Sequence, residues 1–527
     1  MKAKVNFPMS EAVRQAYREG KEDETLLPRV LVDASGNPIG RIKRGDSVIF
    51  YNIRGEREIE LTSSLTERGF AEFAVSSELD LNFATMIEYK KGLNVQVAFP
   101  PAETLRDTLS DIISQHHLKQ AKITEAEKAV HVGFFFNGKK NELLPGEERV
   151  IVPTRKDVAL FDEAPEMSIE KISAAVIARI HDNSCNFIAV NFPNVDVVSH
   201  IENEAALLRA IQAVDKQAGI VIENAQKKGI PVIVTADHGS AEKWLYPDGA
   251  VDTGHTDSPV PFILLHPDKK LTLRPEGELA DVAPTLLNIL GLPSSPSMTG
   301  RSLIEQKLTA GESAKRLLLI ILDGWGINEK TKGNMIVRAH TPIMDRLLKS
   351  YPRSCLAASG EAVGLPAGTV GNSEAGHLHI GAGRRIYSDR LKIDRAIAEK
   401  DFFNNDAFLS VIRNAKKKQH PLHLMGIVSF FSSHGSINHL FALMEMAKQE
   451  GMEKLFIHAM LGRRGEMPES GAQYIKKIEE KAILLNLGQV VSVIGRYWSM
   501  DREENWDRIE KTYRMLLYGE GVKVQGQ

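Results

Sequence analysis

Short apolar runs rich in β-forming residues alternate with amphipathic segments along almost the whole chain. The runs span 46–53, 82–89, 131–137, 187–192, 230–236, 316–322, 423–429, 453–460 and 489–495. Between two of them, apolar side chains recur at spacings of four and three, at Leu207, Ile211, Val214, Ala218 and Val221, which places them on one helix face. Alternating strands and helices predict an α/β fold with mostly parallel sheets and helices on both faces.

The length and composition bear on the number of domains, the partners and the compartment, but they do not indicate a function. The chain has 527 residues, more than one core normally serves, so we expect more than one domain. A formal net charge of −2 with 25% charged residues gives no reason to expect nucleic acid or a membrane surface as a partner. Cys185 and Cys355 indicate neither a disulfide framework nor a cysteine-based zinc site. No apolar signal core and no membrane-length apolar run occur, so we expect a cytoplasmic protein.

Acidic and histidine side chains recur where the predicted parallel strands end. Ligands bind at that edge of such a sheet. Each of these residues alone has an ordinary explanation, because an aspartate often caps a helix and a histidine often serves packing. Together they favour divalent ions such as manganese, zinc or cobalt over calcium. The candidates are Asp196, His200, Asp237, His238, His255 and Asp323.

A glycine-rich loop, 367–384, carries a candidate nucleophile, Ser373. A serine hydroxyl needs a base or a metal ion to become reactive near neutral pH. Glycines on either side allow the backbone to approach a phosphate closely. The alternative is a flexible loop with an ordinary serine, and the residues of the loop leave both interpretations open.

Arginines follow two other predicted strands. Arg54 and Arg57 come after the run at 46–53, and Arg496 and Arg502 come after the run at 489–495. Guanidinium groups bind phosphate and carboxylate through paired hydrogen bonds. These four side chains predict a pocket for a small anion, although surface arginines are usually only solvated.

Longer motifs carry a family resemblance over nearly the whole chain. They are ILDGWG, VGNSEAGHLHIGAGR, FPNVDVVSH, TADHG, GHTDSPVPF, ITEAEKAVHVGFFFNG, AFPP and IGRYWSMDRE. The sequence resembles the cofactor-independent phosphoglycerate mutases of the alkaline phosphatase superfamily. In that family the ILDG strand comes first and the TADHG half last, whereas here the order is reversed around a polar junction at 308–316. The resemblance therefore implies a circularly permuted chain with one site.

The resemblance implies two domains. A metal-binding phosphatase-like domain would span 103–387, with an alkaline-phosphatase-like parallel sheet. A second α/β domain that binds phosphoglycerate would combine 1–102 with 388–527. We expect a monomer whose partner is a small phosphorylated glycerate.

The resemblance also assigns roles to residues. One metal ion would be held by Asp196, His200 and His255, and the second by Asp323, Asp237, His238 and Ser373. Ser373 would carry the phosphoryl group, and Lys128 would stabilise it during transfer. The substrate would be bound by His434, Arg464, Arg496, Arg502, Arg54 and Arg57. Manganese is the expected ion, with zinc, cobalt and magnesium left open, and no 2,3-bisphosphoglycerate is needed.

Two stretches depart from the family pattern. The segment HAMLGRRGEMPES, 458–470, keeps Arg464 but has Gly462 and Gly465 where the family has aspartates, the second being its proposed acid/base. In SFFSSHGS, 429–436, His434 is kept and Ser436 replaces a histidine. Three hypotheses follow: a mutase in which another carboxylate such as Glu466 acts as the base, a metal-dependent phosphatase or phosphomutase for another small phosphate ester, and a non-catalytic homologue.

Overall fold

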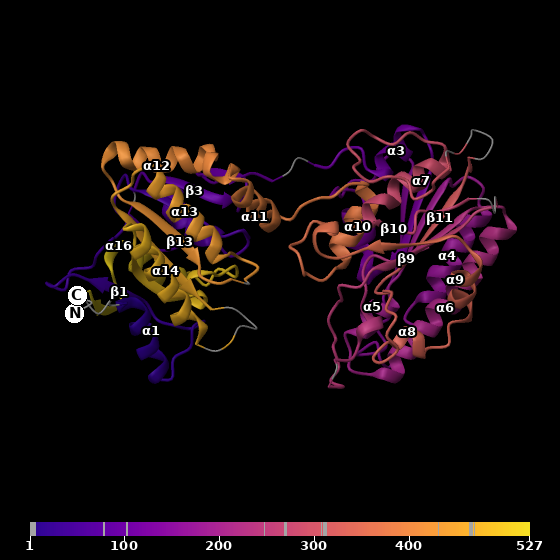
Figure 1. Cartoon of the computed structure of the whole chain (residues 1–527), viewed down its shortest axis with the longest axis horizontal. Coiled ribbons are helices and arrows are strands. Elements are labelled where there is room, and N and C mark those ends of the chain that lie inside the picture. Colours follow the sequence, from indigo (N-terminus) through magenta and orange to yellow (C-terminus); the bar gives the residue numbers. More distant parts are fainter. Residues whose placement is uncertain are drawn as a thin grey trace. The chain divides into compact units, whose positions relative to one another are not determined.

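The computed structural model describes residues 7–76, 79–101, 104–246, 248–267, 271–306, 308, 313–430, 432–462, 467 and 469–526. The chain divides into two compact units (Figure 1). Unit 1 comprises Met1–Pro101 and Asp389–Gln527, and unit 2 comprises Ala102–Ser388. Each unit has an eight-stranded sheet and a hydrophobic core of its own. The predicted α/β fold with two domains is confirmed.

The sheet of unit 2 has the strand order β10-β12-β9-β8-β11-β7-β5-β6. Strands β8, β11, β7, β5 and β6 run parallel, while β9 is antiparallel to both of its neighbours. The central strand β11 is buried at every position, as expected for a strand covered on both faces. The strands are β5 (Gln120–Glu125), β6 (Glu147–Val152), β7 (Phe187–Phe192), β8 (Val232–Thr235), β9 (Val260–Leu265), β10 (Glu276–Glu278), β11 (Leu317–Leu322) and β12 (Arg353–Ala357).

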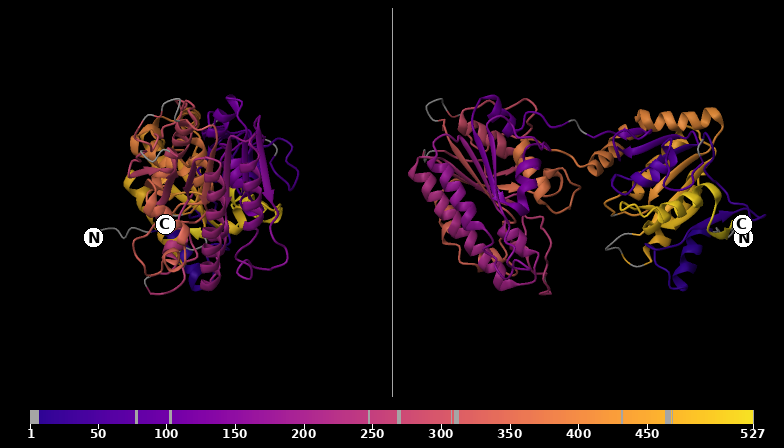
Figure 2. Two further views of the ribbon diagram at one scale, coloured as in Figure 1. Left: turned by 90° about the vertical axis from the view of Figure 1, so that its right-hand side faces the viewer. Right: turned by 180° about the vertical axis from the view of Figure 1, so that it is seen from behind.

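Helices cover both faces of this sheet. On one side lie α4 (Ile169–His181), α6 (Glu204–Lys227) and α9 (Pro342–Ser350), and on the other lie α3 (Leu109–Gln115), α7 (Val282–Leu290) and α10 (Ser373–Ala382) (Figures 1 and 2). The predicted amphipathic helix is α6, in which Leu207, Ile211, Val214, Ala218 and Val221 are all buried. Two short α-helices, α5 (Asn194–Ser199) and α8 (Met335–Arg338), also belong to this unit, together with several single helical turns.

The sheet of unit 1 has the order β16-β1-β15-β14-β13-β2-β3-β4. All neighbours run parallel except β1 and β15. The first and last strands of the chain lie side by side, where the indigo and yellow segments of Figure 1 meet. The strands are β1 (Arg29–Val32), β2 (Ser47–Phe50), β3 (Asn82–Ile87), β4 (Gln96–Phe99), β13 (Leu422–Ile427), β14 (Leu455–Leu461), β15 (Gln489–Gly495) and β16 (Val522–Gln525).

The helices of unit 1 pack on this sheet and on one another. Helix α14 (Ser470–Leu485) contacts α1 (Pro8–Arg18) and α13 (Ile437–Gln449), whereas α2 (Ile59–Thr66) contacts α16 (Trp506–Tyr518). Helix α12 (Asp406–Lys418) covers β2, β3 and β4. The remaining helices are α11 (Asp389–Glu399) and α15 (Arg496–Ser499).

One predicted strand is wrong. The run at 131–137 forms a π-helical turn over His131–Phe135 that packs against α10. The strand of this region is β5, which ends a few residues earlier and buries polar side chains such as Lys122 and Thr124. Apolar content alone does not separate a strand from a buried helical turn in so short a segment.

Candidate metal centre

Four neighbouring parallel strands of unit 2 bring polar residues to one edge of the sheet. Lys128 follows β5, Asp196 follows β7, Asp323 follows β11, and Asp237 with His238 follows β8. The turns after β7 and β11 are joined by a hydrogen bond from Asp196 N to Asp323 O of 3.1 Å. The parallel register therefore gathers residues that lie far apart in the sequence.

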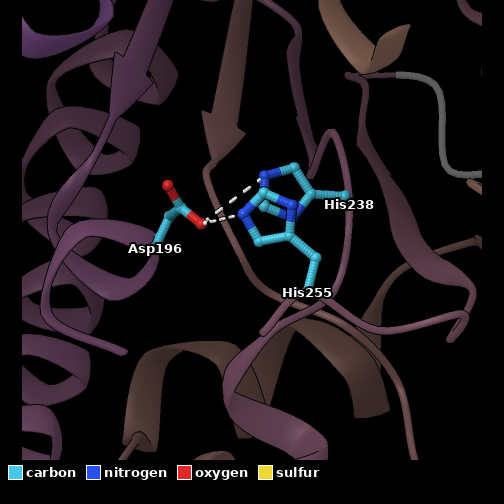
Figure 3. Close-up of side chains that lie close together, drawn as sticks. All are labelled: Asp196, His238 and His255. Carbon is cyan, nitrogen blue, oxygen red and sulfur yellow. Dashed lines mark ion pairs between the residues drawn. The ribbon is translucent and has the colours of Figure 1, made fainter. Parts of the chain in front are cut away.

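Asp196, His238 and His255 form the first group, with ligand atoms within 4.8 Å of one another. Both imidazoles present Nε2 to Asp196 Oδ1, at 3.1 Å from His255 and 3.6 Å from His238 (Figure 3). His200 lies at the rim, with Nε2 3.4 Å from Asp196 Oδ1 and 3.3 Å from His255 Nε2. One carboxylate with several imidazole nitrogens is a ligand set that suits a divalent transition-metal ion.

Backbone carbonyls orient all three imidazoles. Nδ1 of His200 lies 2.7 Å from the Thr253 carbonyl oxygen, and Nδ1 of His255 lies 3.0 Å from that of Gly371. His238 Nδ1 is 3.1 Å from the carbonyl oxygen of Gly239. Such contacts hold the proton on Nδ1 and leave Nε2 as the free ligand atom.

Asp237, Asp323 and His377 form the second group. His377 Nδ1 lies 3.2 Å from Asp237 Oδ2, and Asn191 donates from Nδ2 to Asp323 Oδ2 at 2.7 Å. Sequence analysis named neither His377 nor Asn191. The signal for His377 was its position four residues after Ser373, because that spacing places both on one face of a helix.

Ser373 begins helix α10, and its hydroxyl lies among the charged groups. Ser373 Oγ is 2.6 Å from Lys128 Nζ, 3.0 Å from His238 Nε2 and 3.4 Å from Asp323 Oδ1. Asn372 caps the helix by accepting from Ala375 N at 2.8 Å. A helix N-terminus favours an anionic group such as a phosphate, so Ser373 is placed where a phosphoryl group would be stabilised.

The charges of the cluster support one another. Lys128 Nζ bridges Asp196 Oδ2 at 2.7 Å and Asp323 Oδ1 at 3.0 Å. Burial opposes its charge, but the carboxylates of Asp323, Asp196 and Asp237 raise the pKa of Lys128 above its usual value. Burial likewise opposes the charge of His238, yet Asp237 and Asp196 raise its pKa to about 10. The site thus carries a negative field that attracts cations.

Two carboxylate oxygens test whether metal ions fit here. Asp196 Oδ1 and Asp237 Oδ2 are buried, and neither accepts a hydrogen bond from the described residues, although His255 Nε2 and His377 Nδ1 lie 3.1 and 3.2 Å away. A buried carboxylate oxygen without a partner is costly, and a divalent cation would satisfy both. In the structure His238 belongs to the group of Asp196, whereas the sequence prediction placed it with Asp237 and Asp323. The group of Asp237 and Asp323 contains His377 instead. His238 Nε2 is also 3.3 Å from Asp323 Oδ1, so it is within reach of both groups.

The predicted anion-binding residues lie in unit 1. Arg54 and Arg57 follow β2, His434 follows β13, and Arg496 opens α15 directly after β15, with Arg502 soon after it. These strands are parallel, so the residues that follow them share one edge of the sheet. Arg464 follows β14 and lies outside the described residues, as do Gly465 and Glu466.

Glu56 links two of these arginines. Its Oε1 accepts from Arg54 Nη2 at 2.9 Å, and its Oε2 lies 2.8 Å from Arg502 Nη1. All three side chains are about half exposed, at 46–48%. Arg57 is held differently, by donating from Nη1 to the Met500 carbonyl oxygen at 3.2 Å.

The structure also accounts for two of the departures from the family pattern. Gly462 has a φ of +103°, and a Cβ there would lie 2.7 Å from Glu24 Cα, so an aspartate would be strained at this position. Ser436 caps helix α13, because its hydroxyl accepts from Asn438 N at 3.3 Å. Both residues therefore suit the local backbone.

Comparison with known proteins supports the binding of metal ions. The family model "Metalloenzyme superfamily" matches residues 31–294. The chain belongs to the metalloenzyme superfamily. A second family model, "BPG-independent PGAM N-terminus", matches residues 393–527. These two matches confirm the family resemblance that the sequence motifs indicated.

Several curated relatives share one name, 2,3-bisphosphoglycerate-independent phosphoglycerate mutase. The protein of Thermomicrobium roseum is 42% identical over 301 residues, which cover 56% of this chain and 57% of that protein. That of Moorella thermoacetica is 39% identical over 296 residues, with the same coverage. The chain thus spans a little over half the length of these relatives, 57%. A crystal structure of Leishmania mexicana phosphoglycerate mutase at low cobalt concentration is 28% identical, covers 52% of this chain and 53% of its own, and has a TM-score of 0.37.

Among the helices of the described part of the chain, none combines the length and the hydropathy that a membrane crossing needs.

Proposed function

We propose that this protein interconverts 3-phosphoglycerate and 2-phosphoglycerate through a phosphoserine at Ser373. The observation that carries the proposal is the position of Ser373 Oγ, 2.6 Å from Lys128 Nζ and 3.0 Å from His238 Nε2. A hydroxyl next to a buried cation and a group of carboxylates is arranged for transfer of an anionic group. The names of the relatives support the choice of substrate.

Two divalent ions, manganese by preference, are part of the proposal. Asp196, His255 and His200 would hold one, and Asp323, Asp237 and His238 the other together with Ser373, with His377 as a further candidate ligand in the second group. When bound, such ions lower the pKa of a coordinated hydroxyl and neutralise phosphoryl charge. Lys128 holds the Asp196 and Asp323 carboxylates in place and keeps positive charge beside Ser373 Oγ. No 2,3-bisphosphoglycerate is required, because the phosphoryl group stays on the enzyme between the two halves of the reaction.

In unit 1, we propose that Arg54, Arg57, Arg464, Arg496, Arg502 and His434 bind the phosphate and carboxylate of the substrate. The strand ends that carry the described members of this set support the proposal, because small anions bind at that edge of a parallel sheet. Glu56 holds Arg54 and Arg502 in the absence of substrate and would be displaced by an incoming anion.

The order of segments along the chain is proposed to be a circular permutation of the family order. Two observations support this. A model named for the N-terminus of the family matches the last part of the chain, 393–527, and the first and last strands, β1 and β16, are hydrogen-bonded neighbours. Permutation is tolerated where chain ends lie close together. We further propose a cytoplasmic monomer that uses neither nucleic acid nor a membrane as a partner.

A second candidate function is hydrolysis of a small phosphate ester or phosphomutase activity on another ester. It is favoured by Gly465, which replaces the acid/base aspartate of the family. Removing an acid/base group typically costs about 10²–10⁴ in rate, whereas hydrolysis of a phosphoserine needs only the groups of unit 2. A non-catalytic homologue is the remaining alternative, and the complete set of charged residues in unit 2 speaks against it.

One experiment separates these functions. Metal-loaded protein is incubated with 3-phosphoglycerate, and 2-phosphoglycerate and free phosphate are measured in the same sample. The mutase is expected to give 2-phosphoglycerate as the main product. Free phosphate alone would indicate a phosphatase, and neither product, with no phosphoserine trapped, would overturn the proposed function.

A further inference from the structure

A buried carboxylate and an imidazole lie between the arginines of unit 1. Glu58 directly follows Arg57, and its Oε1 is 3.1 Å from His434 Nδ1. Glu58 is fully buried, and His434 is 5% exposed. The two residues are 376 positions apart in sequence, and a hydrogen bond of 2.7 Å from Ile53 N to the His434 carbonyl oxygen joins their loops. The pair therefore belongs to the same sheet edge as the predicted substrate-binding residues.

The carboxylate of Glu58 is held by three hydrogen-bond donors. Oε1 accepts from Asn52 Nδ2 at 2.7 Å as well as from His434, and Oε2 accepts from the backbone N–H of Arg57 at 3.0 Å. Asn52 is itself oriented, because its Oδ1 accepts from Ile427 N at 2.8 Å. A carboxylate with this set of donors cannot turn away from the imidazole.

The contact with Glu58 selects one arrangement of the His434 ring. A carboxylate can only accept from Nδ1–H, so the neutral ring carries its proton on Nδ1 and a lone pair on Nε2. Among the described residues, the hydrogen bond of the ring is the one at Nδ1, to Glu58. Nε2 is therefore the ring atom left to exchange a proton with a ligand.

A second histidine–carboxylate pair in the same unit, His423 with Asp46, serves for comparison as a purely structural pair. His423 Nε2 lies 3.2 Å from Asp46 Oδ2, and its Nδ1 lies 3.0 Å from His458 Nε2. Both ring nitrogens are engaged, and His423 is 0% exposed. Asp46 precedes β2 and His423 is near the start of β13, so this pair lies at the opposite ends of the strands from His434.

We infer that His434 exchanges protons with the hydroxyls of the bound glycerate and that Glu58 is its positioning residue. The inference rests on the proposed function and supplies the acid/base group that Gly465 removes. The base predicted from the sequence was Glu466. The Glu58–His434 pair is the better candidate, because its geometry suits proton exchange.

The cycle begins with a second proton on His434, at Nε2, and with Ser373 Oγ deprotonated. As Oγ bonds to phosphorus, the bond from phosphorus to O3 of the glycerate breaks. O3 leaves with the electron pair and takes the proton from Nε2, so the ring becomes neutral with a lone pair on Nε2. In the second half, the O2 hydroxyl gives its proton to Nε2 while O2 bonds to phosphorus and the bond to Ser373 Oγ breaks. His434 ends protonated as it began, and Ser373 Oγ recovers its starting state.

The test uses the full-length metal-loaded protein and the two-product assay with 3-phosphoglycerate. Glu58→Gln and His434→Gln are compared with Asp46→Asn, the matched control that weakens the structural pair. We expect His434→Gln to lower formation of 2-phosphoglycerate by about 10²-fold or more and Glu58→Gln to lower it by about tenfold or more. Phosphoserine formation at Ser373 should be slower than in wild type but still detectable. Because the two residues act as a unit, the double variant should be no slower than His434→Gln alone.

Thermal unfolding separates the acid/base role from a purely structural one. Asp46→Asn should lower the unfolding temperature without changing the ratio of 2-phosphoglycerate to phosphate, whereas Glu58→Gln and His434→Gln should shift that ratio toward phosphate. Equal losses in all three variants, in proportion to stability, would overturn the inference, and so would a loss of isomerisation in Glu466→Gln but not in His434→Gln. If wild type forms neither product nor phosphoserine, the proposed function fails instead.

Discussion

The candidate site of unit 2 and the anion-binding residues of unit 1 lie at equivalent edges of two parallel sheets but differ in burial. In unit 2, the side chains of Lys128, Asp196 and Asp323 are 0–6% exposed and bond directly to one another. In unit 1, Arg54 and Arg502 are about half exposed and share Glu56. Charges act most strongly where water is excluded, so the buried cluster suits bond-breaking and the open arginines suit capture of a substrate.

The departures from the family pattern named above are confined to the unit with the open site. The changed positions Ser436, Gly462 and Gly465 all belong to unit 1. The Glu58–His434 pair lies there too and is as buried as the groups of unit 2. The following experiments test whether the buried cluster of unit 2 carries out phosphoryl transfer and whether the exposed arginines of unit 1 select the substrate.

The largest effect is expected from Ser373→Ala. Without the hydroxyl no phosphoserine can form, so turnover should fall by about 10⁴-fold or more. The change opens no core cavity, and the unfolding temperature should stay close to that of wild type. Product assays and mass spectrometry of trapped phosphoenzyme measure this. Ser359→Ala is the control, since the hydroxyl that it removes donates to the Asp257 carbonyl oxygen. A phosphoryl group trapped on another residue would refute the assignment.

Removal of metal should abolish both products. Exhaustive chelation leaves the carboxylates of Asp196 and Asp237 without a cation, and added Mn²⁺ should restore turnover. Because an ion that binds only the folded state stabilises it, Mn²⁺ should also raise the unfolding temperature of wild type and should do so less in Asp237→Asn. Unchanged turnover after chelation would contradict the metal site.

Gly465→Asp sharpens the comparison within unit 1. The family aspartate would add a second acid/base group, so isomerisation should rise relative to phosphate release, and wild type should release more phosphate than a family member that has the aspartate. We expect a change of about tenfold, below the usual 10²–10⁴ for such a group, because His434 already exchanges the proton.

Gly462→Asp is the control for that change. It introduces the same side chain where φ is +103°, so it should lower the unfolding temperature and leave the ratio of the two products unaltered. If wild type isomerises rapidly without detectable phosphate release, the missing aspartate has been replaced completely.

The smallest effect is expected from Arg502→Gln. One exposed guanidinium contributes a charge-assisted hydrogen bond to binding, so KM for 3-phosphoglycerate should rise by about tenfold or less while kcat changes little. Arg413→Gln is the control, since Arg413 pairs with Glu450 on the surface of the same unit. A large fall in kcat would place Arg502 in the chemical step rather than in substrate capture.

The sequence pattern predicts the architecture well where a strand is buried on both faces. An uninterrupted apolar run identified β11, a run with one polar residue identified β7, and apolar spacing identified α6. The pattern is misleading at 131–137, where an apolar run forms a helical turn that packs against α10. The domain boundaries, the permuted order and the roles of the site residues stay predictions.

By itself the sequence determined which residue types stand at the strand ends, because a strand, its end and the next polar residue are local features. Only the tertiary structure decided the partners. His238 reaches both carboxylate groups, His377 joins Asp237 through the docking of α10, and Glu58 meets His434 across 376 positions. Such pairs depend on how distant segments pack, and that long-range packing leaves no periodic signal in the chain.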